Sequence, residues 1–362
     1  MNTAPRDKIR GRGAPINPEG RFERLQTGAF YQEELTDPDD LDSARPVETI
    51  VYRDSSKSII STNDSPDVGM EATVNPYRGC EHGCIYCYAR PTHEYMGLSA
   101  GLDFETKIFA KPDAPALLKA ALQSPAWQPR VISMSGVTDP YQPIERKLRI
   151  TRGCLEVLAR FRNPVAIITK NNLVTRDIDL LGEMATHKTA AVFVSITSLN
   201  PDLARRLEPR ASTPALRLKT VEALAKAGIP VGIMIGPVLP GLNDHEIPAI
   251  LKSAADAGAG NAYYTMLRLP YGVKDLFQAW LQEHFPDKAA RVLSLVRDVR
   301  QNKLNNSEFG TRMVGTGPYA AQIEQMIAVY KKKYGLGRHR HQILSTAAFN
   351  RDAYNPQGNL FA

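Results

Sequence analysis

Three of the chain's four cysteines lie within eight residues, and this clustering constrains the chain more than any other feature of its sequence. They are Cys80, Cys84 and Cys87, spaced C-x3-C-x2-C within the segment Asn75–Arg90. A disulfide framework would spread paired cysteines along the chain, whereas clustered thiols in a reducing compartment more often hold a metal. The spacing therefore predicts a metal centre built on one tight loop.

Two kinds of metal centre are compatible with this loop. Three thiolates can ligate three corners of a [4Fe–4S] cluster and leave the fourth iron open. An open iron can chelate the methionine end of S-adenosylmethionine (SAM), whose C–S bond breaks when an electron enters the sulfonium. Gly79 and Gly83 allow the backbone to fold closely around such a cluster. Structural zinc is the alternative, with His82 or His93 as fourth ligand, although zinc sites usually combine two separated pairs and the chain has no second C-x-x-C.

Short apolar runs recur from about residue 70 and predict buried parallel strands. Amphipathic stretches such as Arg146–Arg162 and Thr213–Ala227 separate these runs. A spacing of about 25–40 residues fits repeated β-loop-α units. The expected strands are Ala72–Tyr77, Val131–Ser135, Val165–Thr169, Ala191–Thr197, Val231–Gly236 and Tyr263–Leu269.

Six strands are too few for a closed eight-stranded barrel and predict a partial one. We expect an α/β fold, a partial (β/α)6 TIM-like barrel with an extended N-terminal leader and C-terminal helices. The active site of parallel α/β barrels lies at the C-terminal ends of the strands, and the first strand runs directly into Cys80. The expected parts are an extended basic leader that is partly disordered or wrapped over the body (1–65), a core barrel (66–272), a helical region with helices Ala289–Leu304 and Tyr319–Tyr334 (273–340), and a tail (341–362).

The cysteine segment resembles the signature of the radical SAM superfamily, C-x3-C-x-aromatic-C, with Tyr86 at the aromatic position. The flanking sequences NPYRGC and CYAR resemble a branch of uncharacterised proteins related to spore photoproduct lyase. The resemblance covers about residues 70–270. It implies a radical SAM barrel and a [4Fe–4S] cluster on Cys80, Cys84 and Cys87. It also implies an enzyme that cleaves SAM reductively to a 5′-deoxyadenosyl radical.

The resemblance also implies where SAM is held. Tyr86 is expected near the adenine, and Thr138 and Asp139 offer acceptors for the methionyl amino group after the second strand. Lys170 ends the third strand, where a cation suits the SAM carboxylate. Ser195 ends the fourth strand and offers a hydroxyl to the ribose.

Each of these residues also has a structural interpretation. Lys170 could face solvent at a strand end, and Ser195 could be an ordinary strand residue. Asp139 could be a turn residue before Pro140. Arg210 could bind the SAM carboxylate or a substrate anion, or it could pair with Glu208.

One departure from the related lyases bears on the reaction. Those lyases carry a hydrogen-donating cysteine just upstream of the Ser/Thr-Asp pair, whereas this chain has Met134–Val137 there. Cys154 falls on the apolar face of the next helix and is expected to be a packed core thiol. Repair of the spore photoproduct is therefore not expected. Candidates for a substrate pocket, without a catalytic role, are Tyr141, Glu145, Tyr263, Tyr264, Arg268 and Tyr271.

The net charge of +7 is concentrated at the two ends of the chain. Residues 1–24 carry +3, and the run Lys331–His341 carries +5. Such ends could contact nucleic acid phosphates, or they could be solvated tails. Near the C-terminus, Gln357–Phe361 resembles the peptide that docks bacterial sliding clamps. Nucleic acid and a sliding clamp are thus candidate partners, besides a one-electron reductant of flavodoxin or ferredoxin type.

No stretch of the sequence is apolar over the length that a membrane span needs, and the N-terminus has no signal-peptide apolar region. We therefore expect a cytoplasmic protein without a membrane partner. Three functions are compatible with these observations. They are a radical SAM enzyme acting on nucleic acid, a radical SAM enzyme acting on a peptide or small metabolite, and a non-catalytic iron–sulfur protein.

Overall fold

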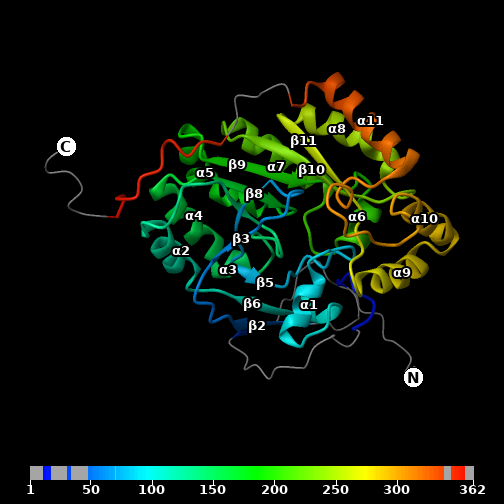
Figure 1. Ribbon diagram of the computed structural model, residues 1–362, viewed down its shortest axis with the longest axis horizontal. Helices are drawn as coiled ribbons and strands as arrows, with labels where there is room; N and C mark the ends of the chain where they lie inside the picture. Colours follow the sequence, from blue (N-terminus) through cyan, green and yellow to red (C-terminus); the bar gives the residue numbers. More distant parts are fainter. Residues whose placement is uncertain (1–10, 18–30, 34–47, 70, 338–343, 355–362) are drawn as a thin grey trace.

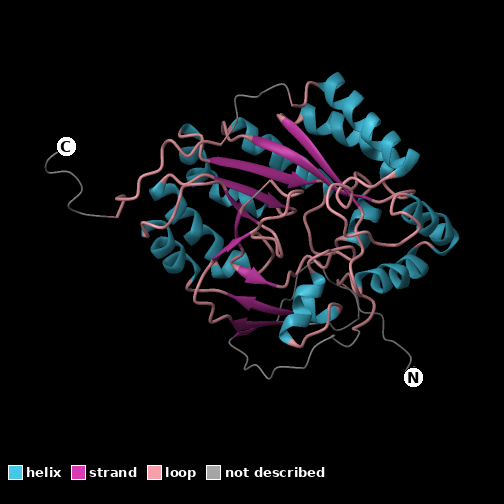
Figure 2. Ribbon diagram, in the orientation of Figure 1, coloured by secondary structure: helices cyan, strands magenta, loops and turns pink. Residues whose placement is uncertain are grey.

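The computed structural model describes residues 11–17, 31–33, 48–69, 71–337 and 344–354. These residues form two sheets and a set of surrounding helices (Figures 1 and 2). None of the helices in these ranges has the length and apolar character that crossing a membrane requires. The clamp-like peptide Gln357–Phe361 lies outside the described residues.

The main sheet carries six parallel strands whose order across the sheet is their order along the chain. This order is the one that successive β-loop-α units produce, and it confirms the predicted partial barrel. The antiparallel strand β3 (Ile60–Thr62) pairs with β4 at one edge. The parallel strands are β4 (Ala72–Val74), β7 (Ile132–Met134), β8 (Val165–Thr169), β9 (Ala190–Ser195), β10 (Val231–Val238) and β11 (Asn261–Met266).

The two faces of this sheet differ in chemistry. On the outer face, side chains such as Val192 and Ile233 are fully buried. Successive side chains of a strand point to opposite faces, so the strand registers place Ser133, Ser195 and Lys170 together on the inner face. Lys170 is partly exposed there. The same face carries the partly exposed Ile168 and Phe193, so it borders a partly open space with both polar and apolar walls, which we call the lumen.

Helices cover the outer face of the sheet (Figure 1). Their starts follow from local sequence: the Thr213 side chain caps α7 by accepting from the Leu216 N–H, and Asn200 caps α6 in the same way. The helices between strands are α2 (Ala114–Gln123), α3 (Glu145–Leu148), α4 (Ile150–Phe161), α5 (Ile178–Thr186), α6 (Pro201–Leu207), α7 (Pro214–Lys226) and α8 (Ile247–Asp256), with 3-10 turns at Asn172–Asp177 and Asp244–Glu246.

A second sheet lies beside the barrel and carries the cysteine loop. Its strands follow the order β1 (Tyr31–Glu33), β2 (Thr49–Arg53), β6 (Lys107–Ala110) and β5 (Tyr77–Arg78). β5 leads directly into Cys80, and α1 (Leu102–Thr106) and the 3-10 helix Arg90–Met96 complete this region. The sheet therefore supports the cysteine loop from the side opposite to the barrel strands.

Three helices follow β11, namely α9 (Val273–His284), α10 (Pro286–Asp298) and α11 (Gly317–Tyr334). α11 packs on α8, and α9 and α10 share a hydrophobic cluster with Ile85 of the cysteine loop.

The helix predicted over Ala289–Leu304 is wrong at its C-terminal end, because α10 ends at Asp298 and the residues after it are not helical. Gln301 and Asn302 have φ values of 57° and 63°, and this left-handed backbone cannot continue an α-helix.

Candidate active site

The three clustered cysteines lie in the loop that leaves β4 and β5, at the C-terminal edge of the parallel strands. Cys80 and Cys84 are buried, and Cys87 is partly exposed. Gly79 and Gly83 have φ values of 79° and 66°. A Cβ atom on Gly79 would lie 2.8 Å from His93 and 2.9 Å from the carbonyl oxygen of Phe104. The expected tight closure of the backbone around these glycines is therefore confirmed.

A buried ion pair holds the backbone of this loop. Arg90 donates to the carbonyl oxygens of Gly83 at 3.2 Å and Cys84 at 2.9 Å. Its Nη2 atom lies 2.5 Å from Oε1 of Glu105, and both side chains are fully buried. Removing one partner of such a pair leaves an uncompensated buried charge, which is strongly destabilising. Arg90 thus fixes the backbone from which the Cys84 thiol projects.

Residues 12–14, which we call the strap, lie against the same loop. The backbone N–H groups of Gly13 and Ala14 donate to the Glu105 carboxylate at 2.9 and 2.8 Å, and Arg12 donates to the Glu105 carbonyl oxygen at 2.9 Å. A Cβ atom on Gly13 would lie 1.6 Å from the carbonyl oxygen of Gly83. These contacts agree with a leader that is wrapped over the body, but no local pattern indicated their partner, because Gly13 and Glu105 are 92 residues apart along the chain.

Arg210 lies at the cysteine loop, where its partner is Glu81. Its Nη1 atom lies 3.4 Å from Oε1 of Glu81, and its backbone N–H donates to the His82 carbonyl oxygen at 3.3 Å. Glu81 is fully buried and also accepts a hydrogen bond from Thr49 at 2.8 Å. The alternative that Arg210 pairs with Glu208 is wrong, since a different arginine neutralises Glu208.

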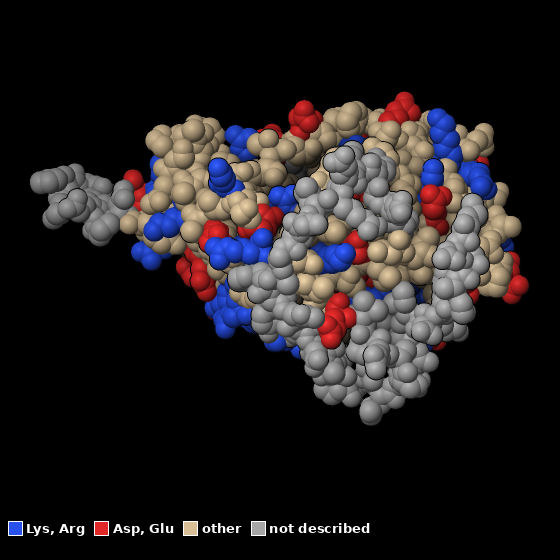
Figure 3. Space-filling view, turned by 90° about the horizontal axis from the view of Figure 1, so that it is seen from below, with Lys and Arg blue, Asp and Glu red and all other residues tan. Residues whose placement is uncertain are grey.

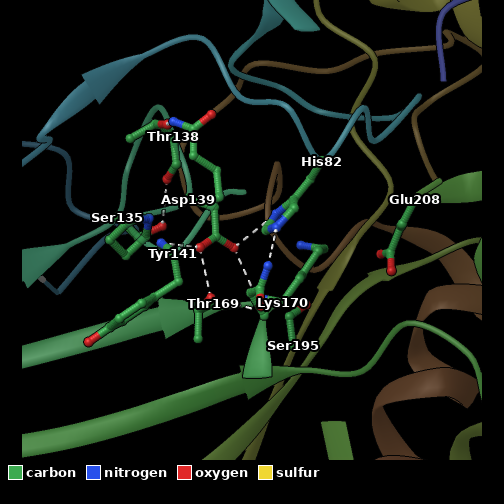
Figure 4. A network of polar contacts seen from close by, with 12 residues as sticks. His82, Ser135, Thr138, Asp139, Tyr141, Thr169, Lys170, Ser195 and Glu208 are labelled. Carbon is green, nitrogen blue, oxygen red and sulfur yellow. Dashed lines mark hydrogen bonds and ion pairs between the residues drawn. The ribbon is translucent and has the colours of Figure 1, made fainter. Parts of the chain in front are cut away.

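Asp139 is the centre of a polar network that joins the cysteine loop to the end of β8 (Figure 4). Its carboxylate accepts from the Thr169 hydroxyl at 2.7 Å and from the N–H groups of Lys170 at 2.8 Å and Tyr141 at 2.9 Å. Its Oδ2 atom lies 3.3 Å from Nδ1 of His82. Burial acts to raise the pKa of Asp139, but His82 and these donors outweigh it and lower the pKa to about 2. The carboxylate is therefore ionised, with partners on both oxygens.

Thr138 attaches the cysteine loop to the turn after β7. Its hydroxyl donates to the Gly79 carbonyl oxygen at 2.6 Å and accepts from Gln142 at 3.1 Å. Ser135 opens this turn with a φ of 130°, and its hydroxyl donates to the Thr138 carbonyl oxygen at 3.1 Å. A non-glycine residue in such a conformation is held there by its surroundings, and such residues cluster at functional sites.

Tyr86 belongs to a second buried network that sequence analysis did not find. Its hydroxyl donates to Glu208 and lies 3.2 Å from Oγ1 of Thr197. Glu208 also accepts from Thr197 at 2.6 Å and forms an ion pair with Arg217. Burial acts to raise the pKa of Glu208, but Arg217, Lys170 and these hydrogen bonds lower it below its ordinary value. No sequence motif linked Glu208 to Arg217, which lies in α7.

Lys170 and Ser195 face the lumen from the ends of neighbouring strands. The Lys170 Nζ atom lies 5.8 Å from the centre of the Tyr86 ring, and no described residue forms a hydrogen bond or an ion pair with it. Burial acts to lower the pKa of Lys170, but Cys84 and Glu208 outweigh it and raise the pKa above its ordinary value. The Ser195 hydroxyl donates to the Gly236 carbonyl oxygen at 3.4 Å. Lys170 is therefore a cation that faces the lumen and makes no ion pair with a described residue, although Glu208 lies near enough to favour its charged form.

The donor set of the loop suits an iron–sulfur cluster. Burial and the nearby Asp139 raise the pKa of Cys80, and burial raises the pKa of Cys84 to about 12. Such thiols ionise when they ligate a metal, because its positive charge compensates the thiolate. A cubane cluster accepts three sulfur ligands spread over one loop. The backbone fixed by Arg90 and the two left-handed glycines provides such a loop.

The histidines considered for zinc have other surroundings. His82 has partners on both ring nitrogens, Asp139 and the Asn171 amide at 3.2 Å. His93 is buried, with Nε2 2.8 Å from the Lys107 carbonyl oxygen, while its Nδ1 has no partner among the described residues. Within those residues, no three His, Cys, Asp or Glu side chains gather closely enough to hold a single metal ion. Of the two histidines, His82 is therefore held on both ring nitrogens by its neighbours.

Two residues considered for a substrate pocket have structural roles instead. Tyr141 is buried and donates to Asp177 at 3.0 Å, and the buried Glu145 pairs with Arg176 at 2.8 Å. Cys154 is fully buried in α4, as expected for a core thiol. Among the other candidates, Tyr263 and Tyr264 lie on β11, and Arg268 and Tyr271 follow it.

Comparison with known proteins gives a family and a fold. The model of the radical SAM superfamily matches residues 74–254. An uncharacterised protein of Mycobacterium tuberculosis is 36% identical over 227 residues, which cover 62% of this chain and 67% of the relative. A protein of Pseudomonas phage M6 named radical SAM Nalpha-GlyT isomerase is 20% identical over 291 residues, 79% of this chain and 56% of the relative.

Among solved structures, spore photoproduct lyase with bound AdoMet and dinucleoside spore photoproduct has the same fold. The TM-score is 0.55 at 16% sequence identity, and the match covers 79% of this chain and 80% of the lyase. The fold match covers a larger share of the chain than the family model does.

Proposed function

The chain belongs to the radical SAM superfamily and is an enzyme, and we propose that it cleaves SAM reductively at a [4Fe–4S] cluster held by Cys80, Cys84 and Cys87. The observation that carries this proposal is that the cysteine loop and the Lys170 side chain lie next to each other. The three-cysteine loop lies at the C-terminal edge of six parallel strands, and beside it Lys170 faces the lumen without an ion pair to any described residue. When bound, the cluster would supply the electron that breaks a C–S bond of SAM and produces the 5′-deoxyadenosyl radical.

We assign the SAM carboxylate to Lys170. A partly exposed cation that makes no ion pair within the described residues can bind an external anion, and Lys170 lies beside Tyr86 of the cysteine loop. Arg210 was the other candidate, but its charge is already balanced by Glu81. Arg210 is therefore assigned to holding the cysteine loop.

The remaining candidate contacts divide into direct and supporting roles. We propose that Ser195 offers its hydroxyl to the ribose and that the Tyr86 ring borders the adenine. Thr138 and Asp139 were candidates for the methionyl amino group, but their side chains are used for the cysteine loop and the end of β8. We assign both residues to orienting this side of the pocket, with the Glu208–Arg217 pair holding the Tyr86 hydroxyl in place.

We propose nucleic acid as the substrate class, with a peptide or a small metabolite as the alternative. Support comes from the basic ends of the sequence and from a fold shared with a lyase whose structure holds a dinucleoside. Lysines and arginines are interspersed with acidic side chains on the face shown in Figure 3, so the proposal does not rest on a continuous basic surface. Repair of the spore photoproduct is not proposed, because residues 134–137 contain no cysteine and Cys154 is buried in α4.

Two further proposals concern the setting of the reaction. The cluster requires a one-electron donor, and we propose a flavodoxin or a ferredoxin. We also propose a cytoplasmic location, where clustered thiols stay reduced.

The cofactor assignment is tested by anaerobic reconstitution with iron and sulfide, followed by metal analysis, reduction with dithionite to the paramagnetic [4Fe–4S]+ state and electron paramagnetic resonance (EPR). Cys84→Ala is compared with Cys154→Ala, which removes a thiol from α4 instead of the loop. Wild type and Cys154→Ala should bind about four irons and show an EPR signal that changes when SAM is added, because SAM ligates the open iron. Cys84→Ala should lose the intact cluster. Equal cluster content in both variants, or a wild-type signal unaffected by SAM, would contradict the proposal.

A further inference from the structure

Arg268, Arg300 and Arg312 lie near the end of β11. The Asp67 carboxylate lies next to Arg312 in this group. Arg300 is buried and donates to the backbone carbonyl oxygens of Met266 at 2.9 Å and Leu267 at 2.7 Å. Arg312 forms an ion pair with Asp67 at 2.6 Å. Arg268 has no carboxylate partner among the described residues. The group therefore carries more positive charge than its own side chains neutralise.

The hydrogen-bonding groups of Arg268 are poorly satisfied within the protein. Its Nε atom is buried without a partner in the part of the chain that the structure describes. Its Nη1 atom lies 3.4 Å from the Met313 sulfur, which is a weak acceptor. Burial and the nearby Arg312 lower the pKa of Arg268, so its surroundings disfavour an uncompensated cation. An external anion at the partly exposed guanidinium would supply the missing charge.

The position of Arg268 relates this anion to the candidate active site. The Arg268 guanidinium carbon lies 5.6 Å from the centre of the Tyr88 ring, and Tyr88 directly follows Cys87. The Tyr88 hydroxyl donates to the Gly136 carbonyl oxygen at 2.5 Å, in the turn after β7. β4 and β11 are the first and last parallel strands of the open barrel. The Arg268–Tyr88 contact therefore links the end of β11 to the cysteine loop, at the entrance of the lumen.

We propose that Arg268 binds a phosphate group of the substrate and that the substrate is a nucleotide unit, either free or within a strand. This inference deepens the proposed function and rests on it for the identity of the site. A guanidinium is planar and has five N–H donors, so it can form two parallel hydrogen bonds to one phosphate group. Tyr88 is 52% exposed beside it and offers a ring face on which a base can stack. An arginine and an exposed aromatic ring together match a phosphate and its base.

The test measures binding to the full-length reconstituted protein by fluorescence anisotropy, without reductant or SAM. The probe is a labelled single-stranded DNA of about twelve nucleotides. Arg268→Gln keeps most of the side chain and removes the charge, and Arg268→Lys restores the charge without the planar fork. Arg205→Ala is the matched control, because Arg205 is an exposed arginine paired with Asp202 on α6. Thermal melting of each variant checks that the fold is retained.

We expect Arg268→Gln to bind the strand about tenfold more weakly than wild type at low salt, because it loses one charged phosphate contact. The affinity of Arg268→Lys for the strand should lie between those of Arg268→Gln and wild type, and the affinity of Arg205→Ala should equal that of wild type. The slope of log affinity against log salt should fall by about 0.7 in Arg268→Gln, as one lost contact to a single strand predicts. Equal affinity and slope for wild type and folded Arg268→Gln would overturn the inference, as would a wild type that binds no probe at low salt.

Competition identifies the form of the nucleotide. If thymidine 5′-monophosphate displaces the strand at concentrations similar to those of the strand itself, the ligand is a free nucleotide. If the monophosphate and inorganic phosphate compete weakly, the ligand is a strand. Since binding is read without SAM cleavage, a protein that binds the probe through Arg268 but never cleaves SAM contradicts the proposed function and leaves the phosphate site standing.

Discussion

At the residue scale, two buried carboxylates lie on either side of Lys170. Asp139 and Glu208 are both ionised carboxylates whose partners come from the protein itself. Lys170 lies between them, and no described residue pairs with its ammonium group. Because its neighbours keep it charged, Lys170 is the group in this region that is most ready to receive an anionic ligand.

Replacing Lys170 with methionine should weaken SAM binding about tenfold, because one charge-assisted hydrogen bond to the carboxylate is lost. Lys170→Arg should retain part of the affinity. The measurement is equilibrium dialysis of SAM against the reconstituted protein. The matched control is Lys226→Met, which removes an exposed lysine paired with Glu222 on α7. Unchanged SAM affinity in Lys170→Met would remove this residue from the site.

Asp139 predicts a pH-dependent contribution to stability. Its pKa falls from an ordinary 3.8 to about 2 on folding, so its contribution of about 2 kcal/mol is present above pH 4 and lost as pH falls through 2. Asp139→Asn should therefore lower the free energy of unfolding of the cluster-free protein at pH 7 by about this amount. The difference from wild type should shrink toward pH 2 in urea titrations. A difference that stays constant from pH 7 to pH 2 would show that the charge of Asp139 is not what stabilises the fold.

At the scale of elements, the sequence predicts the barrel well and its surroundings poorly. The six parallel strands were predictable, because strands with most residues of both faces buried leave short, continuous apolar runs such as Val165–Thr169. β2 and β6 belong to no repeated β-loop-α unit, and their pairing joins Ile50–Arg53 to Lys107–Ala110, so no regular spacing along the sequence indicated them. The strap and the Glu208–Arg217 pair were not predictable, because they depend on contacts that no local pattern encodes.

The strap gives a prediction at this scale. Gly13→Ala places a Cβ atom 1.6 Å from the Gly83 carbonyl oxygen, so the strap must leave the cysteine loop. We expect Cys84 of the cluster-free protein to react faster with a thiol reagent and the reconstituted cluster to be lost sooner in air. Gly69→Ala is the control, since a Cβ atom there meets no atom within 4 Å. Equal thiol reactivity in the two variants would show that the strap does not cover the loop.

At the scale of the whole molecule, two sheets enclose one site from different directions. The barrel contributes the ends of β7, β8 and β9, and the second sheet with the strap supports the cysteine loop from the other side (Figure 1). The superfamily match ends at residue 254, so the helices α9 to α11 and the Arg268 region lie beyond it. The substrate contact that we infer therefore lies outside the residues that match the superfamily model.

The most direct measurement of the central claim is the yield of 5′-deoxyadenosine from SAM after anaerobic reduction of the reconstituted protein with dithionite. Wild type and Cys154→Ala should both form the nucleoside, since Cys154 is a core thiol in α4. Cys84→Ala should form none, because the loop can no longer hold the cluster. A fully loaded wild-type cluster that produces no 5′-deoxyadenosine, with or without a DNA strand present, would contradict the account.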